Sequence, residues 1–397
     1  MNNFEWIYHK LYGIESAGVL RDLPSPFSTY DVSRGTFVGY EGKEFLIFCS
    51  NDYLGMTKNA EVLEELRKSV CTGGSGASRL VSGNFAQHVE FEEFISEVFG
   101  LSQTGRSVLL FNSGWAANIG VISSLADEES EIFSDQLNHA SIIDGCRLSK
   151  AKITVFPHLD LDFLEISLRK STAKFKLVVV DSIFSMDGDL APLEDLRYIC
   201  DKYGAVLYVD EAHAFGVVGK TGRGLQEFLG VQGDVSVYTL SKAVGLYGAF
   251  VIAPRKVIDY IRSTARSFIF STAIPPYICS AAIKSISIIL RADELRAKLA
   301  ENVSILIDGI RQKLGVELKT SSHIIPFIIG GELDALKVYE MLFDRGVFVR
   351  AIRYPSVPRG TARLRITVSA VHTKDQIQRF ASELFDVMSS INVSRGT

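Results

Sequence analysis

The stretch Val235–Gly248, VSVYTLSKAVGLYG, decides the fold because it joins an apolar run to a polar turn that ends at Lys242. A second apolar run, Ala205–Val209, ends at Asp210 and is followed by His213. The residues between Asp210 and Lys242 leave room for one helical crossover and a return strand. We therefore expect these two side chains at the ends of neighbouring strands.

An amine and a carboxylate placed in this way are the two groups that a pyridoxal phosphate (PLP) enzyme needs. The amine of Lys242 would form a Schiff base with the cofactor. The carboxylate of Asp210 would keep the pyridine nitrogen protonated, so that the ring can accept the electrons of a carbanion. Taken alone, Lys242 could equally be a surface lysine after a core strand, and the surrounding pattern decides between the two.

That pattern is typical of a mostly parallel, doubly wound α/β sheet. Short apolar runs recur from Val108 onward, and helical patterns such as Ala116–Leu125 and Leu193–Tyr203 fill most of the gaps. Ligands of such sheets bind beyond the carboxyl ends of the strands. The apolar runs are Val108–Phe111, Glu131–Phe133, Ile153–Phe156, Leu177–Val180, Ala205–Val209, Val235–Tyr238 and Ala249–Ala253.

Polar residues follow five of these runs, and their convergence is a stronger indication of a site than any single motif. Each group stands where a strand is expected to end, which is the edge at which ligands bind. The groups are Ser113–Trp115, Asp135–His139, Asp181–Asp187, Asp210–His213 and Thr239–Lys242.

The two ends of the chain predict smaller elements. Residues 1–20 have the periodicity of an amphipathic helix that a proline-containing segment, Leu23–Phe27, brings to an end. Two short strands are expected over Thr36–Tyr40 and Glu44–Phe48. After Pro275 and Pro276 a long helical stretch runs to about Leu314. Apolar runs over 324–329, 347–352 and 362–369 follow, and then a final helix from about Lys374.

We therefore expect three regions. Residues 1–50 form an N-terminal helix and short strands, residues 51–285 form a large PLP-binding α/β domain, and residues 286–397 form a smaller α+β C-terminal domain.

Composition excludes several classes of protein. Hydrophobic residues make up 47% and charged residues 22% of the 397, and the formal net charge is −4, which gives no electrostatic footprint for nucleic acid. The five cysteines form no CxxC pair, so we expect neither a metal site nor a disulfide framework. The N-terminus lacks an apolar core of signal-peptide length, and no apolar run approaches a membrane span, so we expect a cytoplasmic protein.

Two glycine-containing stretches invite other interpretations. Gly73–Ser78 follows a helical pattern rather than a strand, so it is not a dinucleotide fingerprint; it is a loop that approaches a ligand or a mere connector. Gly219–Thr221 resembles the end of a P-loop, but Ala214 stands where that motif needs a glycine. A P-loop NTPase is the alternative from a different class, and it would also be an α/β protein.

The remaining motifs have a structural reading and a functional one. Ser113–Trp115, between a strand and a helix, could receive a phosphate at the helix N-terminus, whereas Trp115 could be plain core. His139 could stack on a ring, act as an acid or base, or only hold a hydrogen bond. Ser271 and Thr272 offer two hydroxyls for a phosphate, or else cap the next helix.

Two arginines alternate in Thr361–Thr367, so a strand there would point both Arg363 and Arg365 to one face. One of them could grip a substrate carboxylate with a bidentate pair while the other makes a surface pair. Ser185 could face the same side of the cofactor as His213.

Together these motifs resemble the α-oxoamine synthases, which are fold-type I PLP enzymes that condense an amino acid with an acyl thioester and release CO₂. The resemblance covers nearly the whole chain in the family's order of motifs. Within the family, residues Ala351–Thr367 are most similar to members that join L-alanine to a pimeloyl thioester in biotin synthesis. The motifs are Ser50–Gly55, His139–Ser141, Phe184–Gly188, Asp210–His213 and Thr239–Lys242.

The resemblance implies a role for each residue. Lys242 would be the Schiff-base lysine, Asp210 the partner of the pyridine nitrogen, and His213 the partner of the cofactor phenolate. His139 would stack on the ring, so that these four form the catalytic set. Further cofactor contacts would come from Gly114, Trp115, Ser185, Thr239, Ser271 and Thr272. Arg21, Ser356 and Arg365, together with His139, would face substrate.

The family also implies a homodimer whose sites lie between the subunits, with Ser271 and Thr272 serving the partner's cofactor phosphate. Trp115 replaces the family's usual Phe or Tyr, and Glu211 stands where a second Asp is frequent, with a side chain expected to point away from the ring. The motifs leave open whether alanine, glycine or serine is used, which acyl chain is taken, and whether coenzyme A or acyl carrier protein carries it.

Overall fold

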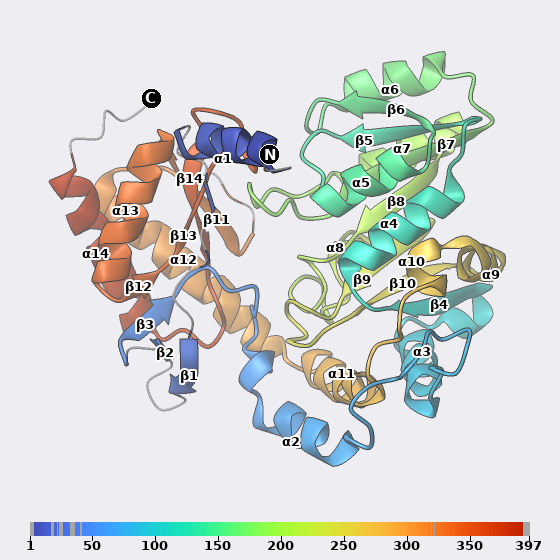
Figure 1. Cartoon of the computed structure of the whole chain (residues 1–397), viewed down its shortest axis with the longest axis horizontal. Coiled ribbons are helices and arrows are strands. Elements are labelled where there is room, and N and C mark those ends of the chain that lie inside the picture. Colours follow the sequence, from blue (N-terminus) through green and yellow to red (C-terminus); the bar gives the residue numbers. More distant parts are fainter. Residues whose placement is uncertain are drawn as a thin grey trace. The chain divides into compact units, whose positions relative to one another are not determined.

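The computed structural model describes residues 4–16, 20–21, 23, 27–31, 36–39, 42–318, 320 and 322–391. The chain divides into two units, which we describe separately (Figure 1). Unit 1 comprises Met1–Ser50, Met186–Gly188 and Lys298–Thr397, and unit 2 comprises Asn51–Ser185 and Asp189–Ala297.

Unit 2 is built on a seven-stranded sheet with the order β4-β10-β9-β8-β7-β5-β6. Strands β5 to β9 pair in parallel, whereas β10 is antiparallel to both β4 and β9. The predicted, mostly parallel sheet is therefore confirmed, and each predicted apolar run lies in a strand. The strands are β4 (Arg106–Phe111), β5 (Ser130–Asp135), β6 (Lys152–Phe156), β7 (Phe175–Asp181), β8 (Val206–Asp210), β9 (Val235–Thr239) and β10 (Ala249–Pro254).

Helices lie along both faces of this sheet, as Figure 1 shows for α4 and α7. Apart from the edge strand β6, the strands are mostly buried on both faces, so alternate residues pack against different helices. The helices of unit 2 are α2 (Ala60–Ser69), α3 (Ala86–Val98), α4 (Gly114–Leu125), α5 (Ala140–Leu148), α6 (Leu161–Lys170), α7 (Leu193–Tyr203), α8 (Leu225–Leu229), α9 (Arg255–Thr264), α10 (Arg266–Ile269) and α11 (Pro276–Ile289). Short 3₁₀ turns occupy η1 (Met56–Lys58) and η2 (Leu101–Gln103).

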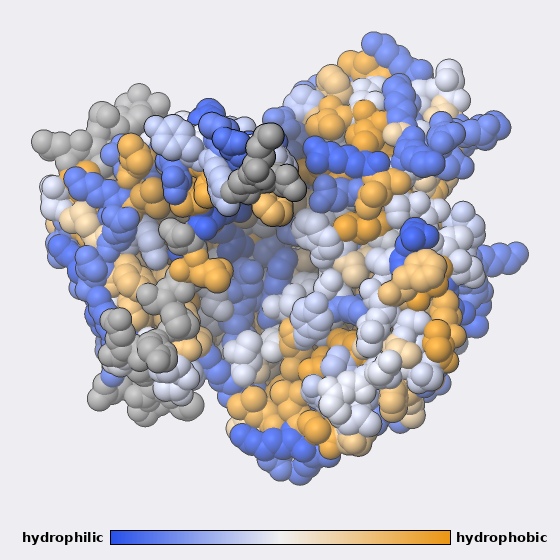
Figure 2. All heavy atoms as spheres, in the orientation of Figure 1, coloured by the Kyte–Doolittle hydropathy of each residue, from blue (hydrophilic) through white to orange (hydrophobic). Residues whose placement is uncertain are grey.

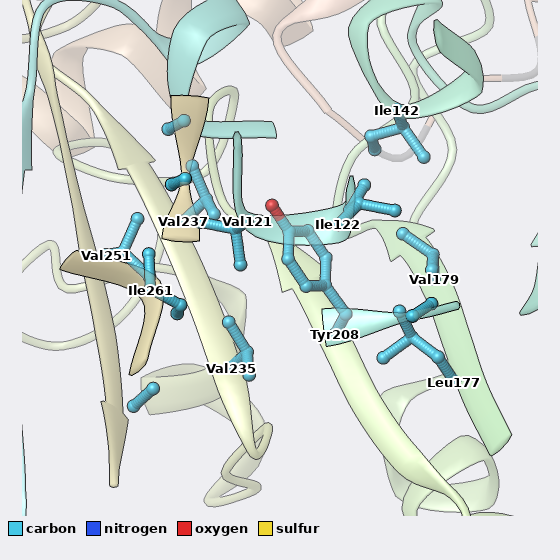
Figure 3. Packing of buried hydrophobic residues seen from close by; sticks show 14 of the residues in the cluster. Val121, Ile122, Ile142, Leu177, Val179, Tyr208, Val235, Val237, Val251 and Ile261 are labelled. Atoms are coloured by element: carbon cyan, nitrogen blue, oxygen red, sulfur yellow. The ribbon is translucent and has the colours of Figure 1, made fainter. Parts of the chain in front are cut away.

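The core on one face of the sheet fixes the strands that carry the polar groups. Val235 and Val237 of β9 pack with Val121 and Ile122 of α4, and Tyr208 of β8 lies in the same cluster (Figure 3). Fully burying an aliphatic side chain of this kind stabilises the fold by ~1.5–3 kcal/mol. The carboxyl ends of β8 and β9 are thus held by a continuous apolar layer.

In its described residues, unit 1 combines two small sheets with four helices, which agrees with the predicted α+β content. One sheet has the order β1-β2-β3-β12, and the other is antiparallel with the order β11-β14-β13. Its strands are β1 (Phe27–Asp31), β2 (Thr36–Gly39), β3 (Glu44–Ile47), β11 (Ile324–Gly330), β12 (Val347–Phe348), β13 (Arg350–Ile352) and β14 (Ala362–Thr367). Its helices are α1 (Glu5–Ser16), α13 (Glu332–Asp344), α14 (Lys374–Ser390) and most of α12 (Asp293–Leu314).

The division between the units differs from the domain prediction in three respects. It falls between Ala297 and Lys298, inside α12, rather than at residue 285. Residues 1–50 group with the C-terminal part of the chain, and so does Met186–Gly188, which was predicted to belong to the large domain. The hydrogen bonds of α12 explain the position. In its first turn Arg296 donates to the Lys220 carbonyl of unit 2, whereas farther along Asn302 donates to the Ser369 carbonyl of unit 1.

Other elements also differ from the sequence-based expectations. The predicted helical stretch up to Leu314 is interrupted between α11 and α12, and β1 and α13 were not predicted. Pro24, Pro26 and Tyr40, which belong to predicted elements, lie outside the described residues. Within the described ranges, no helix is both long enough and apolar enough to span a membrane. On the face drawn in Figure 2, hydrophilic residues are spread over the surface with smaller hydrophobic groups between them.

Candidate active site

A cavity of about 250 Å³ opens in unit 2 where β7, β8 and β9 end. Seven of the residues predicted to bind the cofactor line it, although they come from four separate stretches of the chain. The predicted members are Gly114, Trp115, His139, Asp210, His213, Thr239 and Lys242, and the other lining residues are Ser113, Asn118, Ser141, Asp181, Ala212 and Ser241.

Asp210 supplies the carboxylate of this cavity and is only 4% exposed. Its Oδ2 accepts a hydrogen bond from Asn118 Nδ2 at 2.7 Å, and its Oδ1 accepts one from the Ala212 N–H at 2.9 Å. A buried carboxylate is tolerated only when such donors replace the lost water. These two bonds therefore fix both the position and the orientation of Asp210.

Asn118 is a site residue that the sequence reasoning missed. It lies inside α4 among apolar residues, so its neighbours predict core, yet its side chain makes three hydrogen bonds. Besides Asp210 it donates to Ser141 Oγ at 2.9 Å, and its Oδ1 accepts from Tyr208 Oη at 2.7 Å. The signal available in the sequence was an amide among the apolar residues of this helix, and the structure shows that this amide is buried.

Lys242 follows β9 and meets His213 across the cavity. Its Nζ lies 2.8 Å from His213 Nε2, and His213 Nδ1 lies 2.7 Å from Tyr53 Oη. Because Tyr53 Oη donates to Asn51 Oδ1 at 3.0 Å, it accepts from His213 Nδ1, which leaves Nε2 as the acceptor for the lysine. Tyr53 is fully buried, so its contact with His213 lies inside the protein.

The turn after Lys242 can exist only with glycine at position 245. Gly245 has φ +74, and a Cβ there would lie 2.5 Å from the backbone nitrogen of Thr57. This close approach packs the lysine turn against the segment that contains Tyr53.

His139 stands at the N-terminus of α5, where its ring accepts hydrogen bonds through Nδ1. That atom lies 3.3 Å from the Ser141 N–H and 2.7 Å from Ser141 Oγ. A backbone N–H can only donate, so Nδ1 is unprotonated and the hydrogen of the neutral ring is on Nε2. Burial lowers the pKa of His139, Asp210 raises it and Lys242 lowers it further, which favours this neutral ring. The Trp115 ring meets the His139 ring edge-on, with centroids 6.0 Å apart.

Asp181, at the end of β7, lies beside Asp210 in the sheet register. Complete burial raises its pKa well above the ordinary value, and the neighbouring Asp210 raises it further, although the His139 N–H that donates to its Oδ2 at 2.7 Å acts in the opposite direction. Two adjacent buried carboxylates repel each other when both are charged, which is why Asp210 contributes to the raised pKa of Asp181.

The other end of the cavity suits a phosphate. Helix α4 begins at Gly114, and Ser113 caps it by accepting from the Ala116 N–H at 3.1 Å. The first-turn N–H groups of a helix have no partners within it and attract anions. Thr239 Oγ1 and Ser241 Oγ, 2.8 Å apart, add hydroxyl groups.

The donor set therefore fits PLP. A buried carboxylate, an amine beside an imidazole, a neutral imidazole beside an indole, and a helix N-terminus with hydroxyl groups match the pyridine nitrogen, the aldehyde, the ring face and the phosphate of that molecule. No group of histidine, cysteine or carboxylate residues in the described part of the chain is arranged to hold a metal ion.

Three predicted cofactor residues of unit 2 do not line this cavity, namely Ser185, Ser271 and Thr272. Ser185 lies in the turn after β7. Thr272 accepts a hydrogen bond at its carbonyl from Asn112 Nδ2, next to the start of α4. Their predicted roles stay predictions.

The predicted substrate residues Arg21, Ser356 and Arg365 all belong to unit 1. Two of them meet, because Arg21 Nη2 donates to Ser356 Oγ at 3.0 Å. The neighbouring Arg353, which the sequence reasoning missed, has a pKa lowered by burial and then by the nearby positive charges of Arg350 and Arg21. Gathered cations of this kind are a favourable place for an anion.

The two alternating arginines of β14 have different surroundings. Arg363 forms an ion pair with Asp187 and donates to the Met186 carbonyl at 3.3 Å, so it holds the tip of the turn that follows Phe184. Arg365 is 7% exposed and lies opposite Arg350 in the sheet. Engagement of Arg363 with its own unit leaves the predicted substrate role with Arg365.

Two further expectations can be compared with the structure. Glu211 turns to Ser182 and α8: its Oε2 accepts from Ser182 Oγ at 2.9 Å and its Oε1 accepts from the Gln226 N–H at 2.8 Å. This direction agrees with the expectation that it points away from the ring. In the P-loop-like stretch, Thr221 donates through its backbone to Glu227, so a carboxylate occupies the place that a phosphate would need. The NTPase alternative is therefore disfavoured.

Comparison with known proteins places these features in a family. The model of the family described as aminotransferase class I and II matches residues 43–384. The 8-amino-7-oxononanoate synthase of Anaeromyxobacter sp. (strain K) is 41% identical over 392 residues, which cover 98% of this chain and 96% of that protein.

Solved structures of related enzymes superpose on this chain, which agrees with the family match. A serine palmitoyltransferase with a PLP internal aldimine superposes with a TM-score of 0.89 at 30% identity, covering 98% of both chains. The 8-amino-7-oxononanoate synthase of Francisella tularensis superposes with a TM-score of 0.74 at 27% identity, covering 87% of this chain and 98% of that one. The chain therefore belongs to the aminotransferase class I and II family. The predicted fold type and the resemblance to α-oxoamine synthases are confirmed.

Replacing Asn118 by Leu should weaken PLP binding by about tenfold or more, because Asp210 would lose a charge-assisted hydrogen bond. Absorbance titration of the PLP-free protein measures the affinity. Ser123→Ala on the same helix is the control, since Ser123 Oγ bonds only to carbonyls of its own helix. Unchanged affinity in a folded Asn118→Leu variant would show that Asn118 does not orient Asp210.

Proposed function

We propose that this chain is a PLP-dependent acyltransferase that condenses L-alanine with a pimeloyl thioester, giving 8-amino-7-oxononanoate, CO₂ and the free thiol in biotin synthesis. The observation that carries the proposal is the cavity in which Lys242, Asp210, His213 and His139 meet. The 41% identity to an 8-amino-7-oxononanoate synthase over nearly the full length supports the choice of reaction.

PLP would supply an electron sink for the carbanion formed at the α-carbon of the amino acid. The Asp210 carboxylate would pair with the protonated pyridine nitrogen, and the hydrogen bond from Asn118 Nδ2 holds that carboxylate in place. His139 offers a neutral ring for stacking, and the hydrogen of that ring is on Nε2. The first turn of α4 binds the phosphate.

Lys242 has two tasks. It holds the cofactor covalently, and as a free amine it removes the α-proton of the amino acid. The Nε2 lone pair of His213 accepts a hydrogen bond from Lys242 Nζ at 2.8 Å and so fixes the position of the amine in the cavity. Arg365 orients the carboxylate of the amino acid.

This reaction is tested by incubating the PLP-loaded protein with alanine, glycine or serine and either pimeloyl or palmitoyl thioester, on coenzyme A and on acyl carrier protein. We expect 8-amino-7-oxononanoate from alanine and pimeloyl thioester, and no product from Lys242→Ala. Lys220→Ala is the control, because Lys220 is exposed in the P-loop-like stretch, and it should keep full activity.

A preference for serine and a palmitoyl chain would place the chain with its serine palmitoyltransferase neighbours and contradict the proposed substrates. Nucleotide hydrolysis that depends on Lys220 would instead support the NTPase alternative.

The distal carboxylate of the pimeloyl chain would bind at the cluster formed by Arg21, Ser356 and Arg353. A negative charge entering an apolar channel is costly unless a cation meets it. Arg21 already donates to Ser356, and the pKa of Arg353 is lowered partly by Arg21, so these groups lie close enough to share one anion.

Arg21→Ala should lower kcat/KM for pimeloyl thioester by roughly 30-fold, since losing one partner of a desolvated charge pair costs on the order of 2–5 kcal/mol. The rate with a neutral acyl chain of equal length should barely change. Arg359→Ala is the control, because Arg359 stacks on Tyr354 in the same segment. Equal losses with charged and neutral chains would make Arg21 a structural residue.

We also propose that the protein is a homodimer, with Ser271 and Thr272 contributing to the partner's phosphate site. Two neighbouring loops of unit 2 expose large apolar side chains beside these hydroxyls. The loops are joined by the bond from the Ala273 N–H to the Ala77 carbonyl at 2.9 Å. Val81 is 79% exposed and Phe270 is 70% exposed, which is costly in an isolated chain.

Phe270→Asp should shift the protein from dimer to monomer in sedimentation velocity and reduce activity with it. Tyr198→Asp is the matched control, because Tyr198 is a 66% exposed aromatic residue on α7. A fully active monomer at assay concentration would refute the shared site.

A further inference from the structure

His158 lies outside the cavity but connects the turn that leads to His139, which lines the cavity, with the turn that follows Asp181, which also lines it. It follows β6, and both of its ring nitrogens face carboxylates. Nδ1 lies 2.9 Å from Asp135 Oδ1, and Nε2 lies 2.6 Å from Asp189 Oδ2. An ionised carboxylate can only accept hydrogen bonds, so both nitrogens donate and the ring is an imidazolium ion.

One end of this bridge leads to His139. Asp135, whose side chain is fully buried, also accepts from the Leu137 N–H at 2.8 Å and from the Leu159 N–H at 2.9 Å. The turn after β5 is therefore tied to the turn after β6, and it ends at His139, the first residue before α5.

The other end leads to the turn over residues 183–190, which carries Ser185. This turn is closed by the bridge between Ile183 and Leu190 and by the bond from the Phe184 N–H to the Asp189 carbonyl at 3.1 Å. The Phe184 ring packs edge-on against the His158 ring, with centroids 4.4 Å apart.

Asp189 depends on His158 for a hydrogen bond that compensates its negative charge. Its Oδ1 is buried and has no hydrogen-bond partner among the described residues, so His158 Nε2 supplies the one hydrogen bond found there for this carboxylate. Removing the imidazolium would leave a partly buried negative charge without compensation, which strains the turn around it.

The electrostatics agree with the geometry. Burial lowers the pKa of His158, but Asp135 and Asp189 outweigh it and raise the pKa to about 10. Asp135 faces the ring from the end of β5, and Asp189 faces it from the turn over 183–190. The ring therefore keeps both hydrogens at neutral pH.

We infer that His158 is a positioning residue: as an imidazolium ion between Asp135 and Asp189, it holds the turn that bears His139 and the turn that bears Ser185 in register for cofactor binding. The link to catalysis rests on the proposed function. The link to cofactor binding does not.

The first test is the protonation of His158 itself. Spectra of the protein labelled with ¹⁵N at its seven histidines, compared with those of His158→Gln, assign the His158 signal. We expect both ring nitrogens to be protonated at pH 8.5, well above the ordinary pKa of 6.5. A neutral His158 ring at that pH would overturn the inference.

The second test is PLP affinity measured with PLP-free protein. Glutamine cannot donate to both carboxylates, so His158→Gln should weaken PLP binding by about tenfold or more, and Asp189→Asn should weaken it less, because it removes the uncompensated charge. His372→Gln is the matched control, since His372 is also buried and bonded at both ring nitrogens, but to backbone groups of unit 1. It should lower stability without changing PLP affinity.

Stability against pH separates the bridge from general packing. Because the folded pKa is raised, the stabilisation from the protonated ring is complete below about pH 6.5 and is lost as the pH rises through about 10. The advantage of the wild type over His158→Gln in unfolding free energy should shrink over that range. A constant advantage would indicate packing alone.

The outcomes also separate this inference from the proposed reaction. Equal PLP affinity in the wild type and in a folded His158→Gln variant would refute the positioning role even if the enzyme makes 8-amino-7-oxononanoate. If Gln prevents folding, Asp189→Asn decides, and unchanged affinity there would refute it too. If the variants lose PLP affinity as expected but the wild type has no synthase activity, the proposed function alone is refuted.

Discussion

The buried carboxylate of Asp210 is the constraint on which the rest of the site depends. A negative charge at 4% exposure is stable only if fixed donors surround it, and Asn118 and the Ala212 N–H provide them. Asn118 is held in turn by Tyr208 and Ser141, and Ser141 fixes the tautomer of His139. One hydrogen-bonded network therefore sets the charge at one end of the cavity and the ring hydrogen at its side.

The sheet explains why this network meets a lysine. Strands β7, β8 and β9 are parallel neighbours, so their carboxyl ends bring Asp181, Asp210 and the turn that contains Lys242 to one edge. The apolar layer between β9 and α4 makes that edge rigid (Figure 3). Burial and the neighbouring Asp210 raise the pKa of Asp181, which lies beside Asp210 at this edge.

The strands and the main site residues could be predicted from the sequence, because short apolar runs and the polar residues that follow them can be recognised from neighbouring residues alone. Asp210, His213 and Lys242 each follow an apolar run directly, and each lines the cavity. Asn118 and His158 escaped prediction, because their partners are distant in the chain and their neighbours look like core or loop. The division inside α12 was missed for a related reason: one unbroken helix serves both units, and no composition change marks Ala297. The predicted role of Ser185 depends on the bound cofactor, and those of Ser271 and Thr272 depend on the cofactor of a partner subunit.

The attachment of PLP at Lys242 is the central claim, and peptide mapping after borohydride reduction tests it most directly. Reduction of the PLP-loaded protein should fix a phosphopyridoxyl group to the peptide that contains Lys242, and the label should disappear in Lys242→Ala but persist in Lys220→Ala. A wild-type protein without label at Lys242, or with its label at another lysine, would contradict the assignment of this cavity as a PLP site.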